Sequence, residues 1–177
     1  MNNDVPFSSQ PLDLYYEHKK LLNLVANENS IEKIKNEIIK SVEIRNKNMI
    51  CSILILDENG DRLLKGASPS LPEYYSSKLN NMIIGEKVGS CGAAVYLKKR
   101  VVVSDISTHE NWKYAKKLAS KYNLCACWSQ PFFSSLNKVL GSFAIYYTKI
   151  REPDEFDIQL IEDVASITGI AIEKYQY

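Results

Sequence analysis

Three stretches of the chain repeat apolar residues with the period of an α-helix, two near its start and one at its end. On their apolar sides lie Leu14, His18, Leu21, Leu22 and Val25; Ile31, Ile34, Ile38 and Val42; and Leu160, Ile161, Val164, Ile167 and Ala171. Lysines and glutamates fill many positions between them, which is the pattern of a helix with one face against a core. Asp154 and Asp157 supply a cap and a first-turn acid for the last stretch. We therefore expect two amphipathic helices to open the fold and a long helix to close it.

Short apolar runs, several of them rich in β-branched residues, predict the strands. These runs are residues 49–56, 62–68, the start of 82–89, 101–105, 124–133 and 138–148. The dipeptide Asn59-Gly60 supplies the positive φ of a tight turn, so the first two strands are expected to pair antiparallel. Pro131 has no backbone N–H, which predicts that its strand leaves part of its ladder unpaired.

The segment between the fourth and fifth strands, residues 105–124, is predicted to leave the sheet. Ser107 followed by Glu110 has the spacing of a capping box, which would begin a helix through Trp112 and Leu118. The whole order of elements predicts an α+β fold with a central antiparallel sheet of about six strands. The terminal helices pack on one face of this sheet, and loops and short helices cover a ligand pocket on the other. We expect residues 11–177 to form one domain and residues 1–10 a flexible tail.

Charge and composition exclude several classes of function. The 177 residues carry 22 Lys plus Arg against 21 Asp plus Glu, and a net charge of +1 gives no field that would hold nucleic acid or an anionic membrane. No apolar run approaches the roughly 20 residues of a membrane span, and the N-terminus lacks the features of a secretory signal. We expect a cytoplasmic protein whose four cysteines are free thiols.

The stretch Gly89-Ser90-Cys91-Gly92 is the first candidate for chemistry. It places backbone N–H groups and a hydroxyl at the start of a helix, where they favour an anionic or carbonyl group and would lower the pKa of the Cys91 thiol. The same four residues also fit a tight turn with a small buried cysteine. Asp105 ends a strand, where its carboxylate can bind a ligand or accept hydrogen bonds from its own turn.

Aromatic and sulfur-bearing residues supply the other candidates. Trp112, Tyr114 and Trp128 fit either a pocket lining or a core. Cys125 and Cys127 lie on one face of their strand because side chains alternate there. A metal site is not predicted, since the chain has two histidines and no C-x-x-C motif, and strand neighbours are poorly spaced for a tetrahedral site.

The runs VGSCGAAVYLKKRVVVSDISTHENW and LCACWSQPFFSSLNKVLGSFAIYYTKI, with the closing helix, are similar to the GAF domains of bacterial signalling proteins over about residues 20–175. This resemblance implies a regulatory module that binds a small molecule between the sheet and its covering loops. It also implies a homodimer through the terminal helices, residues 11–42 and 154–175, beside an output module such as a histidine kinase or a cyclic-di-GMP enzyme. The expected ligand-binding residues are Ser90, Cys91, Asp105, Trp112, Tyr114, Cys127 and Trp128.

Two alternatives stay open within the same family. Stand-alone GAF domains that act as free methionine-R-sulfoxide reductases use a cysteine thiolate, and Cys91 paired with Cys125 or Cys127 would serve here. Their catalytic cysteine falls in the segment where this chain reads HENWKYAKKLASKY, which has no cysteine, so no catalytic residue is assigned. The other alternative is a dimerisation scaffold without a ligand. No cofactor is expected, because the motifs of cyclic-nucleotide and bilin binding are missing and His109 better fits a capping segment than a haem ligand.

Overall fold

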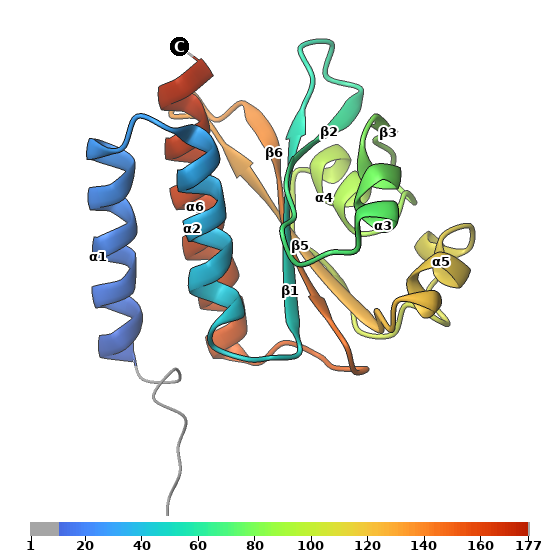
Figure 1. Cartoon of the computed structure of the whole chain (residues 1–177). Helices are drawn as coiled ribbons and strands as arrows, with labels where there is room; N and C mark the ends of the chain where they lie inside the picture. Colours follow the sequence, from blue (N-terminus) through green and yellow to red (C-terminus); the bar gives the residue numbers. More distant parts are fainter. Residues whose placement is uncertain (1–10, 177) are drawn as a thin grey trace, which may run out of the picture.

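A six-stranded antiparallel sheet divides the molecule into two layers in the computed structural model, which describes residues 11–176 (Figure 1). The helices are α1 (Pro11–Asn27), α2 (Ile31–Glu43), α3 (Glu73–Leu79), α4 (Cys91–Leu97), the 3-10 turn η2 (Glu110–Trp112), α5 (Lys116–Lys121) and α6 (Glu155–Gln176). The strands are β1 (Met49–Leu56), β2 (Arg62–Ala67), β3 (Met82–Ile83), β4 (Val101–Val103), β5 (Ala126–Phe133) and β6 (Val139–Tyr147). The predicted α+β fold is confirmed. The expected tail, residues 1–10, lies outside the described residues.

The strands follow the order β3-β2-β1-β6-β5-β4, and every neighbouring pair is antiparallel. The long central strands β1 and β6 pair Ile53 with Phe143 and Cys51 with Ile145. The first two strands form the predicted hairpin, and Gly60 has a φ of +76° in its loop. Because β4 pairs with β5 only as far as Ser129, Pro131 lies beyond its end and needs no N–H there, as predicted.

Helices α1, α2 and α6 cover one face of the sheet, and their apolar sides form the first core. Ile34, Ile38 and Val164 are completely buried there. Gly169 lets α6 approach the sheet closely, since a Cβ at this position would lie 2.5 Å from the carbonyl oxygen of Phe133. The predicted cap of α6 is present: Asp154 Oδ1 accepts from the N–H of Asp157 at 2.8 Å.

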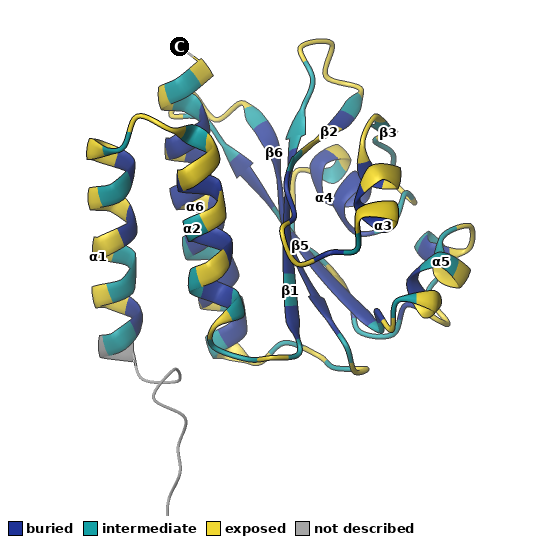
Figure 2. Cartoon of the chain, in the orientation of Figure 1, coloured by how far each residue is buried: buried dark blue, intermediate teal, exposed yellow. Residues whose placement is uncertain are grey.

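Helices α3 and α4, the turn η2 and helix α5 lie on the other side of the sheet and form, with the loops between them, what we call the roof; strands β3 and β4 in the same part of the chain belong to the sheet. Between the roof and the sheet is a second core that includes Leu54, Tyr75, Trp112 and Tyr146. Figure 2 shows buried positions on both faces of the sheet. The sheet is therefore sandwiched between long helices and short ones.

The predicted capping box at Ser107 is wrong. Asp105 Oδ1 accepts from the N–H and the hydroxyl of Ser107 at 2.9 and 2.6 Å, so this pair closes a local turn instead. The first turn begins later, with His109 Nδ1 accepting from the N–H of Asn111 at 3.1 Å. The expected continuous helix is in fact the turn η2 followed by the separate helix α5.

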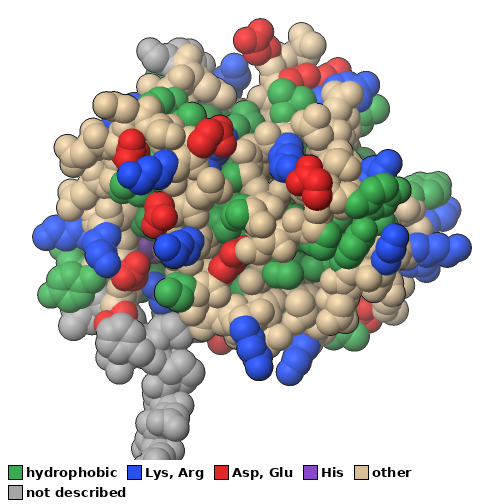
Figure 3. Space-filling view, viewed as in Figure 1, with side chains coloured by type: hydrophobic (Ala, Val, Ile, Leu, Met, Phe, Trp, Pro, Cys, Tyr) green, Lys and Arg blue, Asp and Glu red, His purple; other side chains and the backbone are tan. Residues whose placement is uncertain are grey.

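Basic and acidic side chains are interspersed on the face shown in Figure 3, in keeping with the net charge of +1. Among residues 11–176, no helix combines the length and apolar character needed to cross a membrane.

Candidate functional site

Small polar side chains lie at the centre of the second core, where α4 and η2 meet β5. The Ser90 hydroxyl donates to the carbonyl oxygen of Cys127 at 2.9 Å and accepts from Trp112 Nε1 at 3.1 Å. One buried serine therefore joins the start of α4, the sheet and the roof. We define the roof cluster as the polar side chains on this face of the sheet and above it: Ser52, Tyr75, Ser90, Cys91, Trp112, Cys127, Ser129, Ser142 and Tyr146.

The alternation of side chains along the strands produces the sheet side of this cluster. On β5, Cys127 and Ser129 share the roof face, while Trp128 between them points to the helices. Ser142 on β6 lies opposite Leu54 of β1 in the register, on the same face.

The loop before α4 is held over the sheet by contacts to η2. Gly89 has a φ of +54°, a conformation that disfavours most other residues. Its N–H donates to Asn111 O at 2.9 Å, and Asn111 Nδ2 donates back to Gly89 O at 3.0 Å. Gly89 thus allows the backbone turn that places Ser90 and Cys91 under the roof.

Two of the four cysteines belong to the cluster and share one hydroxyl. Cys91 Sγ lies 3.1 Å from Ser129 Oγ, and Cys127 Sγ lies 3.8 Å from the same oxygen. A hydrogen bond from the Cys127 thiol is the largest cause that lowers the pKa of Cys91, whereas burial raises the pKa of Cys127 well above its ordinary value. Of the two thiols, Cys91 therefore loses its proton more readily than Cys127.

Aromatic rings form the roof side of the cluster. The hydroxyls of Tyr75 and Tyr146 are 3.2 Å apart, and Trp112 packs edge-on against Tyr146 with 6.3 Å between ring centroids. Burial raises the pKa of both tyrosines, so both phenols stay neutral. These rings present hydroxyl and N–H groups to the cluster, together with apolar faces.

The cluster contains hydroxyl oxygens that are not fully hydrogen-bonded. The Oγ atoms of Ser52 and Ser142 are buried and make no hydrogen bond of ordinary length, although the Ser142 hydroxyl lies near enough to Cys91 to help lower the pKa of that thiol. Among the described residues, the buried charged side chains Lys35 and Asp157 both belong to the helical face of the sheet. The cluster is therefore polar but uncharged, with unused hydrogen-bonding capacity.

Two of the expected site residues lie outside this cluster. The Asp105 carboxylate is engaged by Ser107, and those hydrogen bonds lower its pKa. It borders a small cavity of about 130 Å³ at the edge of the roof, together with Lys116 and Cys125. The Tyr114 side chain is 92% exposed and points away from the sheet. Neither residue shares a contact with Ser90 or Cys91.

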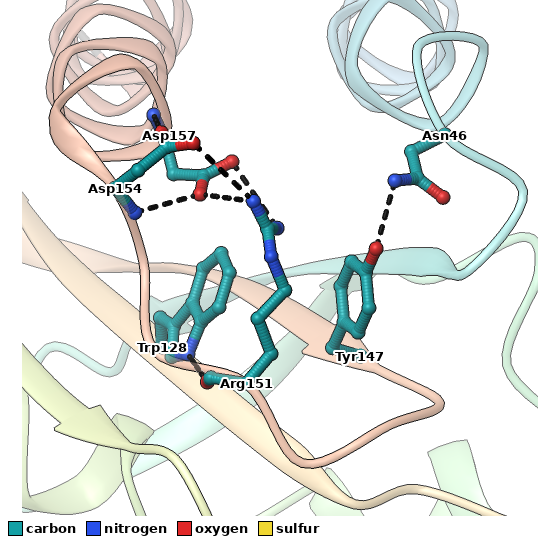
Figure 4. Close-up of polar contacts among 6 residues, drawn as sticks. All are labelled: Asn46, Trp128, Tyr147, Arg151, Asp154 and Asp157. Atoms are coloured by element: carbon teal, nitrogen blue, oxygen red, sulfur yellow. Dashed lines mark hydrogen bonds and ion pairs between the residues drawn. The ribbon is translucent and has the colours of Figure 1, made fainter.

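Trp128 was also expected in the pocket, and the structure corrects this interpretation. Its neighbour Cys127 faces the roof, so strand alternation turns Trp128 toward the helices. There it stacks on Tyr147 with 5.9 Å between centroids and donates from Nε1 to Arg151 O at 3.2 Å (Figure 4). The same figure shows the Arg151 guanidinium above these rings, paired with Asp157.

Of the expected residues, the structure thus brings together Ser90, Cys91, Trp112 and Cys127. Sequence reasoning missed Ser129 and Ser142, and also the tyrosines Tyr75 and Tyr146. The period of two, counted from Cys127, would have found Ser129. Among residues 11–176, no three His, Cys, Asp or Glu side chains are grouped so as to hold a metal ion.

Comparison with known proteins identifies the family to which this fold belongs. The model of the GAF domain family matches residues 29–173. The chain belongs to the GAF domain family, as its sequence motifs indicated.

A curated relative is the methyl sulfide methyltransferase-associated sensor of Methanosarcina acetivorans, which is 31% identical over 173 residues. The match covers 98% of this chain and 17% of that protein, so the chain spans a minor part of its relative's length.

Solved structures share the fold at low sequence identity. The GAF domain of a phosphoenolpyruvate-protein phosphotransferase from Coxiella burnetii matches with a TM-score of 0.76 and 14% identity, over 93% of this chain and 95% of that one. The free methionine-R-sulfoxide reductase from Neisseria meningitidis, in complex with its substrate, matches with a TM-score of 0.71 and 17% identity, over 92% of this chain and 90% of that one. At these identities the likeness concerns the fold alone. The fold occurs in both regulatory and catalytic proteins.

Proposed function

We propose that this GAF domain is a regulatory sensor that binds a small, uncharged, polar molecule in the roof cluster and catalyses no reaction of its own. The observation that carries the proposal is the pair of buried hydroxyls, Ser52 and Ser142, neither of which makes a hydrogen bond of ordinary length in the protein. A buried polar group left unpaired costs about 1–3 kcal/mol. Such groups at the centre of a sheet are explained when a bound molecule completes their hydrogen bonds.

The chemistry of the cluster favours an uncharged ligand. Its polar groups are hydroxyls, thiols and an indole N–H, so no side chain in it would neutralise a carboxylate or an ammonium group. The aromatic faces of Tyr75, Trp112 and Tyr146 would contact the apolar part of the same molecule.

The position of the cluster supports a sensory role. Its upper side is made of short elements, α3, α4 and η2, whereas its lower side is the central sheet. The short elements η2 and α3, which pack on little of the sheet, move at lower cost than the long helices. A ligand under the roof would shift α4 and η2 against the sheet, and this motion could be passed to an output module. The curated relative is itself described as a sensor, which agrees with this proposal.

A sulfoxide reductase activity is less well supported. Cys91 is 4% exposed and Cys127 is fully buried, so neither thiol is open to a substrate as large as methionine sulfoxide. The uncharged cluster also offers no partner for the charged ends of free methionine sulfoxide. The thiol pair receives another explanation below.

The experiment compares wild type with Ser142→Ala. Removing an unpaired buried hydroxyl should leave the empty protein as stable or up to about 1 kcal/mol more stable. The same change should weaken ligand binding about tenfold, since one hydrogen bond to the ligand is lost. Melting temperatures are measured with dimethyl sulfide, dimethyl sulfoxide and methionine sulfoxide; the first two are uncharged, and the relative's name refers to methyl sulfide.

Ser41→Ala is the matched control, because its hydroxyl already donates to Ile38 O on the helical side. It should keep any ligand-induced shift. A Ser142→Ala protein that melts lower than wild type and binds equally well would contradict the proposal. Turnover of methionine sulfoxide with a thiol reductant would establish the reductase instead.

A further inference from the structure

Cys91 and Cys127 are 36 residues apart in sequence and meet under the roof. Cys91 begins α4, Cys127 lies in β5, and both sulfur atoms approach Ser129 Oγ, at 3.1 and 3.8 Å. The backbones are held together as well, since Ser90 donates to the carbonyl oxygen of Cys127 itself at 2.9 Å. No disulfide joins them in this structure, where all four cysteines are free.

We propose that Cys91 and Cys127 form a reversible redox site, in which a hydroperoxide converts the two thiols into a disulfide between the roof and the sheet. The inference concerns the same cluster as the proposed function but does not depend on a bound ligand. It adds a second input to the domain, an oxidant, and a covalent means of fixing the roof.

The chemistry assigns a different role to each sulfur. The Cys91 thiolate attacks one oxygen of the peroxide, the O–O bond breaks, and the leaving hydroxide takes up a proton to become water. Cys91 is now a sulfenic acid. The Cys127 sulfur attacks the Cys91 sulfur, the S–O bond breaks, and the departing hydroxide combines with the Cys127 proton as water. Two thiols lose two electrons in total, and the peroxide is reduced to two waters. A dithiol reductant reverses the change by thiol–disulfide exchange.

The hydrogen bonds of the pair explain these roles. Ser129 and the Cys127 thiol both stabilise the charged form of Cys91, and their hydrogen bonds lower its pKa. A thiolate is the reactive form of cysteine, so Cys91 is the expected nucleophile. Cys127 keeps its proton and supplies the second sulfur.

The other two cysteines lie away from this pair. Cys51 is on the helical face of the sheet, where burial raises its pKa well above the ordinary value. Cys125 is partly exposed and its sulfur faces the Asn123 side chain and carbonyl. Cys125 is close to Cys127 in sequence, which makes it the matched control.

Disulfide formation would change the roof. A sulfur–sulfur bond of about 2.05 Å is shorter than any contact between two thiols, so α4 must move toward β5. Ser90 is the neighbour of Cys91 and accepts from Trp112 Nε1, and the movement would therefore disturb the contact that holds η2.

The experiment treats the folded, reduced protein with hydrogen peroxide, blocks remaining thiols, and maps tryptic peptides without reduction. Cleavage after lysine gives one peptide of residues 88–98 with Cys91 and one of residues 122–138 with both Cys125 and Cys127. In wild type and in Cys125→Ser these two peptides should be joined, and a dithiol should separate them again. In Cys91→Ser and Cys127→Ser the joined species should fall at least tenfold. Circular dichroism before treatment checks that each variant is folded.

Two results of this experiment would overturn the proposal. A link that is lost in Cys125→Ser but kept in Cys127→Ser would overturn the proposal and assign the bond to Cys125. Wild type that forms the link only in urea would also overturn it, because the folded geometry would then play no part. Either failure leaves the ligand test with Ser142→Ala untouched.

Discussion

At the scale of single residues, Arg151 connects the loop before α6 to the sheet. Its guanidinium lies 2.7 Å from Asp157 Oδ2, and its Cζ is 5.3 and 4.9 Å from the ring centroids of Trp128 and Tyr147. Burial raises the pKa of Asp157, while the Arg151 charge lowers it. The Arg151 guanidinium therefore neutralises Asp157, donates hydrogen bonds to it and packs over the two aromatic rings (Figure 4).

We expect Arg151→Ala to lower the free energy of unfolding by about 2 kcal/mol, because it leaves the buried Asp157 without its counter-ion. This is below the effect of breaking a fully buried pair, since Arg151 is partly exposed. Urea unfolding measures the change. Arg100→Ala, which removes a more exposed pair with Glu162, should cost no more than about 1 kcal/mol. Equal losses in the two variants would refute the role given to Arg151.

A second prediction concerns pH and His18. Its Nδ1 lies 3.3 Å from Asp163 on α6, yet its pKa is lowered, first by burial and also by Arg45, against the opposing effects of Asp163 and Glu17. A histidine whose pKa is lowered on folding binds fewer protons in the folded state than in the unfolded state. Stability should therefore fall as the pH drops below the unfolded pKa of about 6.5.

Urea unfolding of wild type and His18→Gln at about pH 7.5 and about pH 5.5 tests this prediction. Glutamine keeps a hydrogen bond to Asp163 but does not titrate. Wild type should lose more stability on acidification than the variant. An equal loss would mean that His18 does not contribute to the pH dependence.

At the scale of elements, α1, α2 and α6 carry the proposed dimer contact. A groove of about 890 Å³ runs between α1 and α2 and is lined by Tyr16, Leu24 and Ile44, among others. Tyr16 and Ile44 are exposed, and so is Ile170 on α6. Ile167, in contrast, is buried in the first core. A charge there would unfold the domain rather than test an interface.

We propose that a second copy of the chain fills the groove between α1 and α2. Light scattering should then show a dimer for wild type and a monomer for Tyr16→Glu, because the charge would be buried in the contact. Tyr15→Glu is the control, since Tyr15 is equally exposed on α1 but does not line the groove. A wild-type monomer would rule the proposal out.

Elements with a clear period were predictable, whereas elements that depend on single polar contacts were not. The apolar spacing in α2 and α6 and the hairpin of β1 and β2 follow from residue patterns that one helix face or one turn requires. The start of η2 could not be predicted from the sequence, because Ser107 and His109 are both able to cap a turn. Only tertiary contacts decide between them.

The candidate site was predictable in part for the same reason. Ser90 and Cys91 were found because glycines mark their loop, and Cys127 because it repeats on a strand. Ser142 was missed, since a serine in an apolar run does not reveal that its hydroxyl is buried unpaired. Trp128 was expected on the roof face because the prediction considered only the size of its ring. It did not consider that Trp128 is next to Cys127 on a strand, so that the two side chains point to opposite faces.

At the scale of the whole molecule, the sheet separates two kinds of packing. The helical face holds the partly buried ion pair of Arg151 and Asp157 and the larger first core. The roof face holds uncharged polar groups beneath short helices. We expect the roof face to respond to a ligand while the helical face stays unchanged.

The two tryptophans of the chain report on these two faces separately. Trp112 donates its indole N–H to Ser90 in the roof cluster, and Trp128 donates to Arg151 O on the helical face. In a spectrum that correlates ¹⁵N with its attached proton, each indole N–H gives one signal. The signal that is missing in Trp112→Phe belongs to Trp112. Titration with dimethyl sulfoxide should move the Trp112 signal and leave Trp128 in place. Movement of Trp128 alone, or of neither signal across dimethyl sulfide, dimethyl sulfoxide and methionine sulfoxide, would contradict the claim that the roof cluster is the sensor site.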